Sequence, residues 1–120
     1  MNMTTSTRNV GGITIVDISG RIVLGKESAS VRDMIHDLLS KGHKQILLNL
    51  GAVDFIDSMG VGSLVNAFMT VRNQGGELKL LNLQEKVAHV MQITKLYTVL
   101  DILNDEAAAV KTFSQATARA

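Results

Sequence analysis

Ser58 is the residue of this sequence whose surroundings most favour chemistry. It follows an apolar run at residues 46–50, which is typical of a buried strand, and it precedes an amphipathic helical pattern. One acid, Asp57, comes directly before it, and two glycines, Gly60 and Gly62, follow. A hydroxyl at a strand-to-helix turn is presented either to react with a substrate or to be modified by another protein.

A nucleophilic Ser58 needs an activating base and a suitable turn. The Gly-x-Ser-x-Gly elbow of hydrolases does not fit, because residue 56 is Ile. The histidines that could serve as the base, His36, His43 and His89, are scattered along the sequence without a relay pattern. We therefore expect that the protein is not an enzyme.

Gly60 and Gly62 also raise the possibility of an anion site, because glycines that open a helix can expose backbone N–H groups. The dinucleotide fingerprint is incomplete, since residue 65 is Val, and no Lys-Ser/Thr follows to make a phosphate loop. The histidines lack metal-ligand spacing, and the chain has no cysteine. We expect neither a cofactor nor a metal.

Two interpretations of the turn remain. Asp57 or Ser58 could simply cap the helix, which stabilises it by about 1 kcal/mol. Two glycines count against a purely structural turn, since each costs about 1 kcal/mol relative to Ala inside a helix.

The other interpretation is phosphorylation of Ser58, which adds a charge of about −1.5 to −2. A carboxylate within about 6 Å, from Asp54, Asp57 or a partner, costs about 2–3 kcal/mol per added charge. The helix N-terminus returns at most about 1 kcal/mol. Repulsion outweighs this gain, so a phosphate would expel a bound partner.

Composition narrows the class of protein. The chain has 120 residues, 19% of them charged, a net charge of +1, and 46% hydrophobic residues. Arg72 and Lys79 stand alone rather than in a basic stripe, which argues against nucleic-acid binding. The N-terminus is polar, and no apolar run reaches the ~20 residues of a membrane span. We expect one cytoplasmic domain over residues 1–120, frayed at 1–3 and 115–120, with no membrane partner.

Strand and helix patterns alternate along the chain, after a hairpin turn at Gly11 and Gly12. This order predicts an α/β domain with a mixed, mostly parallel sheet of four to five strands and about four helices. We expect strands at residues 4–10, 13–18, 45–50, 77–83 and 99–103, and a short strand or loop at 21–24. We expect helices around residues 31–39, 61–71 and 84–94 and after Asn104, with Ser28 or Ser30 capping the first and Asn104 the last.

Residues 46–64 resemble the signature of STAS domains, and more narrowly of stand-alone bacterial anti-sigma factor antagonists. The similarity continues at residues 16–22, 76–80 and 93–96. It implies a STAS fold and partner switching. Such a protein, when unphosphorylated, binds an anti-sigma factor that is also a serine kinase, and thereby releases a sigma factor. Phosphorylation, here on Ser58, breaks the complex, and a serine phosphatase restores it.

The resemblance also implies a binding face on a monomer or weak dimer. Its residues are Arg21, Ile22, Val23, Leu24, Glu27, Asp54, Asp57, Met59, Gly60 and Gly62. Two positions depart from the family. Asn49 stands where Asp is common, and Val23-Leu24 stands where many members carry an Asp that contacts the partner. Met59 is bulkier than usual, and the sequence leaves open whether it is an exposed anchor or buried packing.

A second interpretation stays open beside the switch. The chain could be a STAS scaffold or docking module of a stressosome-like or lipid-transport assembly. Ser58 would then be silent, and the helix around residues 61–71 would be the docking surface.

Overall fold

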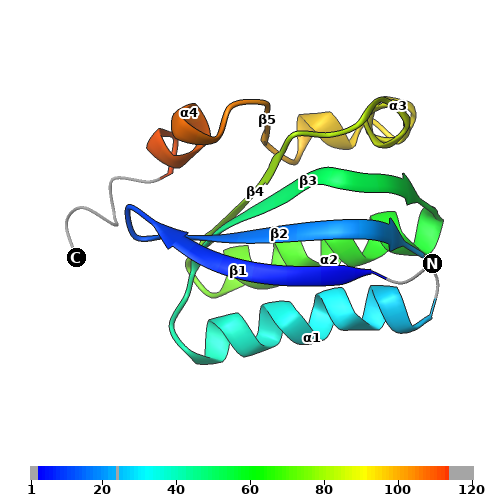
Figure 1. The fold of residues 1–120 in the computed structure, drawn as a ribbon. Coiled ribbons are helices and arrows are strands. Elements are labelled where there is room, and N and C mark those ends of the chain that lie inside the picture. Colours follow the sequence, from blue (N-terminus) through cyan, green and yellow to red (C-terminus); the bar gives the residue numbers. More distant parts are fainter. Residues whose placement is uncertain (1–2, 24, 114–120) are drawn as a thin grey trace.

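The computed structural model describes residues 3–23 and 25–113, in which five strands form one mixed sheet in the order β1-β2-β3-β4-β5. Helices α1 and α2 lie on one side of the sheet, and α3 and α4 lie on the other (Figure 1). The strands are β1 (Thr4–Val10), β2 (Ile13–Ile22), β3 (Gln45–Ile56), β4 (Glu77–Leu81) and β5 (Ile102–Leu103). The helices are α1 (Lys26–Ser40), α2 (Ser58–Asn73), α3 (Glu85–Ile93), α4 (Glu106–Lys111) and the 3-10 helix η1 (Leu96–Thr98).

The sheet topology confirms the predicted hairpin and the mostly parallel sheet. Strand β1 pairs antiparallel with β2 through a turn in which Gly11 and Gly12 have φ values of 58° and 85°. These positive values suit glycine and match the twist of a tight hairpin. The other strand pairs are all parallel. The parallel arrangement places the carboxyl ends of β2 and β3 side by side.

The core explains why the central strands read as continuous apolar runs. Ile46, Leu47 and Leu48 in β3 are each fully buried, because helices cover both faces of the sheet at this point. A large cluster fills the space on the α1 and α2 side and reaches α3, and a smaller one lies under α4. Met3, which we expected to be frayed, is half-buried and packs against the larger cluster. The other predicted frayed residues, at both ends, lie outside the described residues.

The helix caps differ from prediction. Gly25, rather than Ser28 or Ser30, is the N-cap of α1, and its φ of 104° is a value that glycine adopts readily. Asp105, rather than Asn104, caps α4, and its carboxylate accepts a hydrogen bond of 2.8 Å from the Ala108 N–H. Each error is a shift of a few residues, which residue type alone does not resolve.

Strands β2 and β3 run further than their apolar patterns suggest. Beyond the predicted end of β3, Arg21 pairs with Phe55 and Ile22 with Ile56. Exposed positions interrupt the apolar pattern here, so long-range pairing, rather than local sequence, makes this segment a strand. The extension brings β3 to within one residue of Ser58.

A polar network ties β1, β2, β3 and α4 together. The Asn49 amide donates to Asp17 Oδ1 at 2.7 Å, and the Asn49 oxygen accepts from the Gly51 N–H at 3.1 Å. Arg8 Nε donates to Asp17 Oδ2 at 2.6 Å, and Arg8 Nη2 reaches Glu106 Oε1 at 2.6 Å. These hydrogen bonds from Arg8 hold the pKa of Asp17 and the pKa of Glu106 below their usual ranges.

The Asn49→Asp substitution, which restores the residue common in the family, is expected to destabilise this chain by about 1–3 kcal/mol at pH 7. The new carboxylate cannot donate to Asp17, which lies 2.7 Å from the present amide. Adding Asp17→Asn should recover much of the loss, because an amide then faces a carboxylate again. Urea unfolding measures both variants, and an unchanged midpoint for Asn49→Asp alone would refute the proposed linkage.

The arginine network predicts an acid-dependent stability. Because the pKa values of Asp17 and Glu106 are lowered in the fold, their stabilisation is complete above the unfolded value of about 4. It is lost as pH falls through the lower folded values. Arg8→Gln should cost up to about 1 kcal/mol at pH 7, since the pairs are partly exposed, and progressively less as the pH falls below the unfolded values and the two carboxylates become protonated.

Urea unfolding across this pH range measures the effect. The exposed Arg32 on α1 gives the control Arg32→Gln, which should follow the wild-type profile. A parallel downward shift of the Arg8→Gln profile at every pH would contradict the pKa argument.

Candidate functional site

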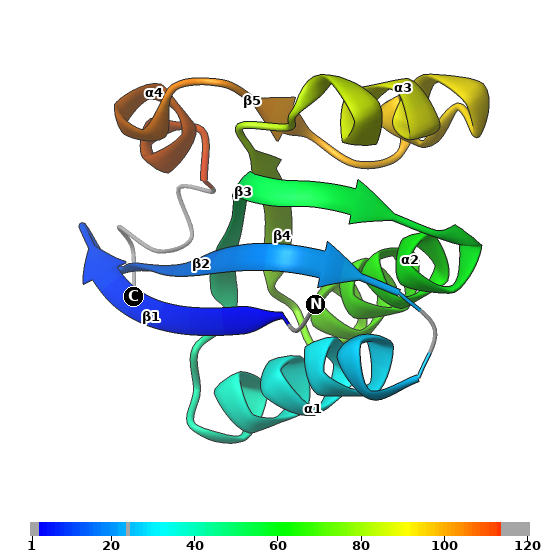
Figure 2. The ribbon, with the colours of Figure 1, turned by 45° about the vertical axis from the view of Figure 1, so that its right-hand side comes forward.

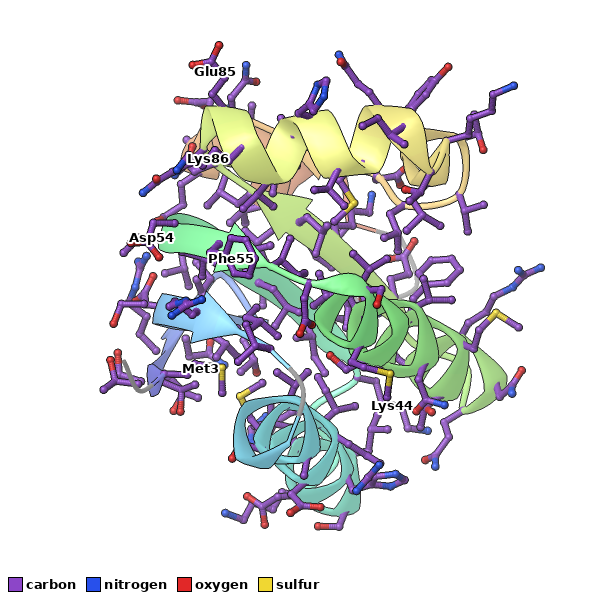
Figure 3. All side chains as sticks on the ribbon, turned by 90° about the vertical axis from the view of Figure 1, so that its right-hand side faces the viewer. Met3, Lys44, Asp54, Phe55, Glu85 and Lys86 are labelled. Carbon is purple, nitrogen blue, oxygen red and sulfur yellow. The ribbon has the colours of Figure 1, made fainter. Side chains whose placement is uncertain are left out.

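Ser58 is the first residue of α2, and a single residue, Asp57, separates it from the end of β3. The turn between them is anchored on β2, because the Asp57 N–H donates to the Ile22 carbonyl at 3.3 Å. Figure 3 views the molecule from this end, with Phe55 near the arrowhead of β3 and α2 running away beside it. The serine thus lies at the carboxyl edge of two parallel strands, where α/β proteins commonly place their binding sites.

Asp57 is the N-cap of α2, which settles the choice between Asp57 and Ser58. Its carboxylate accepts from the Gly60 N–H at 2.8 Å, and its carbonyl accepts from the Val61 N–H at 2.9 Å. Ser58 is exposed, and no hydrogen bond to its hydroxyl is present within the described part of the chain. The hydroxyl therefore has no role in this cap, and the residue that carries it lies on the surface.

The two glycines of the motif have different surroundings. A Cβ atom on Gly60 would lie 2.1 Å from the Ile22 carbonyl oxygen and 2.7 Å from Ile56 Cγ1. Gly60 is therefore needed for α2 to pack on the end of β2. A Cβ atom on Gly62 would meet nothing within 4 Å, and the residue is exposed. Gly62 thus weakens the helix without serving the packing of this chain.

Apolar side chains remain exposed around Ser58. Met59 is 52% exposed and Phe55 is 40% exposed, so Met59 lies on the surface rather than in the core. The Arg21 guanidinium lies 4.9 Å from the centre of the Phe55 ring, a cation–π distance that orders both side chains. Among the described residues, Arg21 thus adds a positive charge beside the partly exposed Phe55.

The outward face of α2 extends this surface and carries no charge before Arg72 in the last turn. No residue from Ser58 to Val71 is charged, although Met59, Gly62, Asn66 and Met69 are all exposed. Depletion of charge and enrichment in methionine are marks of protein interfaces. The sequence pattern predicts this helix but does not single out Met69 as an exposed residue. The sequence signal that could have identified this surface is the absence of charged residues from Ser58 to Val71.

The predicted binding residues fall into three groups. Arg21, Asp54, Met59 and Gly62 are exposed, and Val23 and Asp57 are half-buried. Ile22 and Gly60 are buried, so each contributes packing beneath the surface. Leu24 and the side chain of Glu27 lie outside the described residues.

Asp54 is exposed near the end of β3 and lies toward Lys86 of α3, away from α2 (Figure 3). Asp57, adjacent to Ser58 in sequence, is therefore the acid that bears directly on the serine.

The described residues contain no group of three or more His, Asp or Glu side chains that could hold a metal ion. Among the helices of residues 3–23 and 25–113, none is long and apolar enough to cross a membrane.

The two glycines give a matched pair of stability tests. Gly60→Ala should destabilise the protein by several kcal/mol or prevent folding, because the added atom clashes with backbone that cannot move freely. Gly62→Ala should stabilise it by about 1 kcal/mol, since the new Cβ meets open space and alanine favours the helix. Thermal unfolding compares the two, and equal effects would contradict the difference in their surroundings.

Comparison with known proteins places this geometry in a family. A family model described as STAS domain matches residues 4–109. An anti-sigma-B factor antagonist from Bacillus subtilis is 34% identical over 87 residues, which are 72% of this chain and 78% of that protein.

Solved structures have the same fold. An anti-sigma factor antagonist from Mycobacterium paratuberculosis is 16% identical, with a TM-score of 0.80, and the match covers 93% of this chain and 94% of that one. The Bacillus cell fate determinant SpoIIAA in its phosphorylated form is 20% identical, with a TM-score of 0.68, covering 90% and 98%. With its hairpin-led mixed sheet and its capped serine turn, this chain belongs to the STAS domain family.

Proposed function

We propose that this protein is a cytoplasmic anti-sigma factor antagonist that works by partner switching and is inactivated by phosphorylation of Ser58. The observation that carries the proposal is the exposed Ser58 hydroxyl, which the cap leaves unused, at the margin of an uncharged surface. Relatives named as anti-sigma factor antagonists support the same role. In its unphosphorylated form, the protein binds an anti-sigma factor with serine-kinase activity and so frees a sigma factor.

The chain is the substrate of the switch reaction and is not itself an enzyme. The kinase transfers the γ-phosphoryl group of ATP to the Ser58 oxygen. A new P–O bond forms, ADP leaves, and the hydroxyl proton passes to a base of the kinase. A serine phosphatase later hydrolyses this bond with water. No cofactor of this chain takes part in either step.

Electrostatics explain how the phosphate acts. A partner seated on the charge-free face of α2 removes water from Met59 and Gly62, and a dianion beside them loses its hydration. Asp57 adds like charge next to the modified residue. The N-terminus of α2 offsets only about 1 kcal/mol. Phosphorylation therefore opposes partner binding without any change in the fold, and a fold like this one exists in a phosphorylated form.

The partner surface differs from the common family pattern. Val23 stands in the segment where many members of the family carry an Asp, and its side chain is half-buried. Apolar contacts with Met59 and Phe55, and a close approach over Gly62, take the place of that polar contact. We infer a partner whose docking surface is correspondingly less basic.

One observation favours the second candidate, a scaffold or docking module without a switch. The uncharged face of α2 extends past the first turn as far as Met69, which is 44% exposed. A docking role predicts that Met69→Lys abolishes binding while Ser58→Asp does not.

Intact-mass spectrometry after incubation with ATP and the serine-kinase anti-sigma factor encoded nearest the gene tests the switch. We expect a gain of one phosphate, mapped to Ser58. Ser58→Asp should weaken binding to that factor about a hundredfold by calorimetry, and Ser58→Ala should retain it. Asn104→Asp, an exposed site before α4, adds the same charge and should bind normally.

Phosphate on another residue, or wild-type affinity in Ser58→Asp, would refute the switch. Gly62→Ala tests the close approach separately. This more stable variant should bind about tenfold more weakly, because a methyl group then stands where the partner packs.

A further inference from the structure

Strand β1 forms an edge of the sheet and is exposed along its whole length. Each residue of Thr4–Val10 is exposed, and within the described residues this strand pairs with β2 alone. Figures 1 and 2 both show β1 at the border of the sheet, with α1 on the side beneath it. Its outer edge therefore offers a row of backbone N–H and C=O groups.

The hairpin determines which groups point outward. Val10 and Ile13 flank the two-residue turn and form its closing hydrogen-bonded pair. Hydrogen-bonded and non-hydrogen-bonded pairs alternate along an antiparallel ladder. Thr5, Thr7 and Asn9 therefore direct their backbone N–H and C=O groups to the free edge.

The edge lacks the usual features that prevent pairing. It has no proline, lysine or bulge, and three of its seven residues are threonine, which favours strands. Its one charged residue, Arg8, binds Asp17 and Glu106 of its own chain. The edge is therefore long and regular, and its only charged side chain is paired within the same chain.

We propose that a second copy of this chain pairs antiparallel along β1 about a two-fold axis at Thr7, joining the two five-stranded sheets. In this register all seven residues pair. Thr7 lies opposite Thr7 of the second copy, Thr5 opposite Asn9, and Ser6 opposite Arg8. No two like charges face each other, because Arg8 lies opposite Ser6 and the axis itself falls on Thr7.

Charge on the adjacent helix is compatible with a self-pairing surface. The exposed side chains of α1 and its C-cap include both signs, among them Arg32, Asp33 and Asp37 of the helix and Lys41 at the cap. Two copies that approach by this edge therefore do not meet a field of one sign. Helix α2 packs mainly on α1 and β4, so the dimer leaves Ser58 open to a partner. The inference is independent of the proposed switch.

Sedimentation equilibrium on the full chain, from about 1 μM to 1 mM, tests the pairing. We expect a monomer–dimer equilibrium in the wild type. Thr7→Lys places two lysines opposite each other at the axis and should raise the dissociation constant about tenfold at low salt, with recovery at high salt. Thr7→Pro removes the outward N–H without touching the β1–β2 ladder and should leave a folded monomer by circular dichroism.

A charge pair tests the register. Thr5→Glu combined with Asn9→Lys forms two opposite-charge pairs across the axis and should lower the dissociation constant about threefold, while Asn9→Lys alone should not. A wild type that stays monomeric at about 1 mM overturns the proposal. So does a Thr7→Lys variant that dimerises like the wild type at low salt. A Thr5→Glu/Asn9→Lys variant without tighter association overturns the register centred on Thr7.

Discussion

The close contact between the first turn of α2 and the last residues of β2 determines the geometry of the whole site. Gly60 lies so near the Ile22 carbonyl that no side chain fits between them. This contact directs the helix axis onto the end of the sheet, and it places Asp57 where its carboxylate can cap that helix and its N–H can bind Ile22. With Asp57 as the cap, the next residue, Ser58, is held outward at a defined position on rigid elements.

Much of the fold could be predicted because it depends on local patterns. Apolar runs identified the central strands, and Gly11-Gly12 identified the hairpin, so the mixed sheet follows from chain order. The extension of β3 to Ile56 could not be predicted in the same way. It is stabilised by pairing with β2, a contact between residues more than thirty positions apart that local polarity conceals.

The site was predictable in kind but not in detail. The motif itself identifies Ser58 and its glycines, yet Gly60 and Gly62 look equivalent in a sequence. Only the neighbouring Ile22 carbonyl distinguishes a glycine required for packing from one that the fold does not need. Asn49 is similar, since its role depends on Asp17, an acid on another strand that Arg8 keeps ionised. Asn49 departs from the family pattern, and Asp17 supplies the acceptor that makes an amide suitable at this position.

The free hydroxyl of Ser58 has a consequence for how a signal is carried. Because this group contributes no hydrogen bond to the described fold, adding or removing a phosphate leaves the folding equilibrium nearly unchanged. In the proposed switch, modified molecules therefore stay folded, and removal of the phosphate restores them. In this switch, the amount of released sigma factor depends on the number of unphosphorylated molecules, which the kinase and the phosphatase set together. Such a response is graded by stoichiometry rather than by a cooperative change of shape.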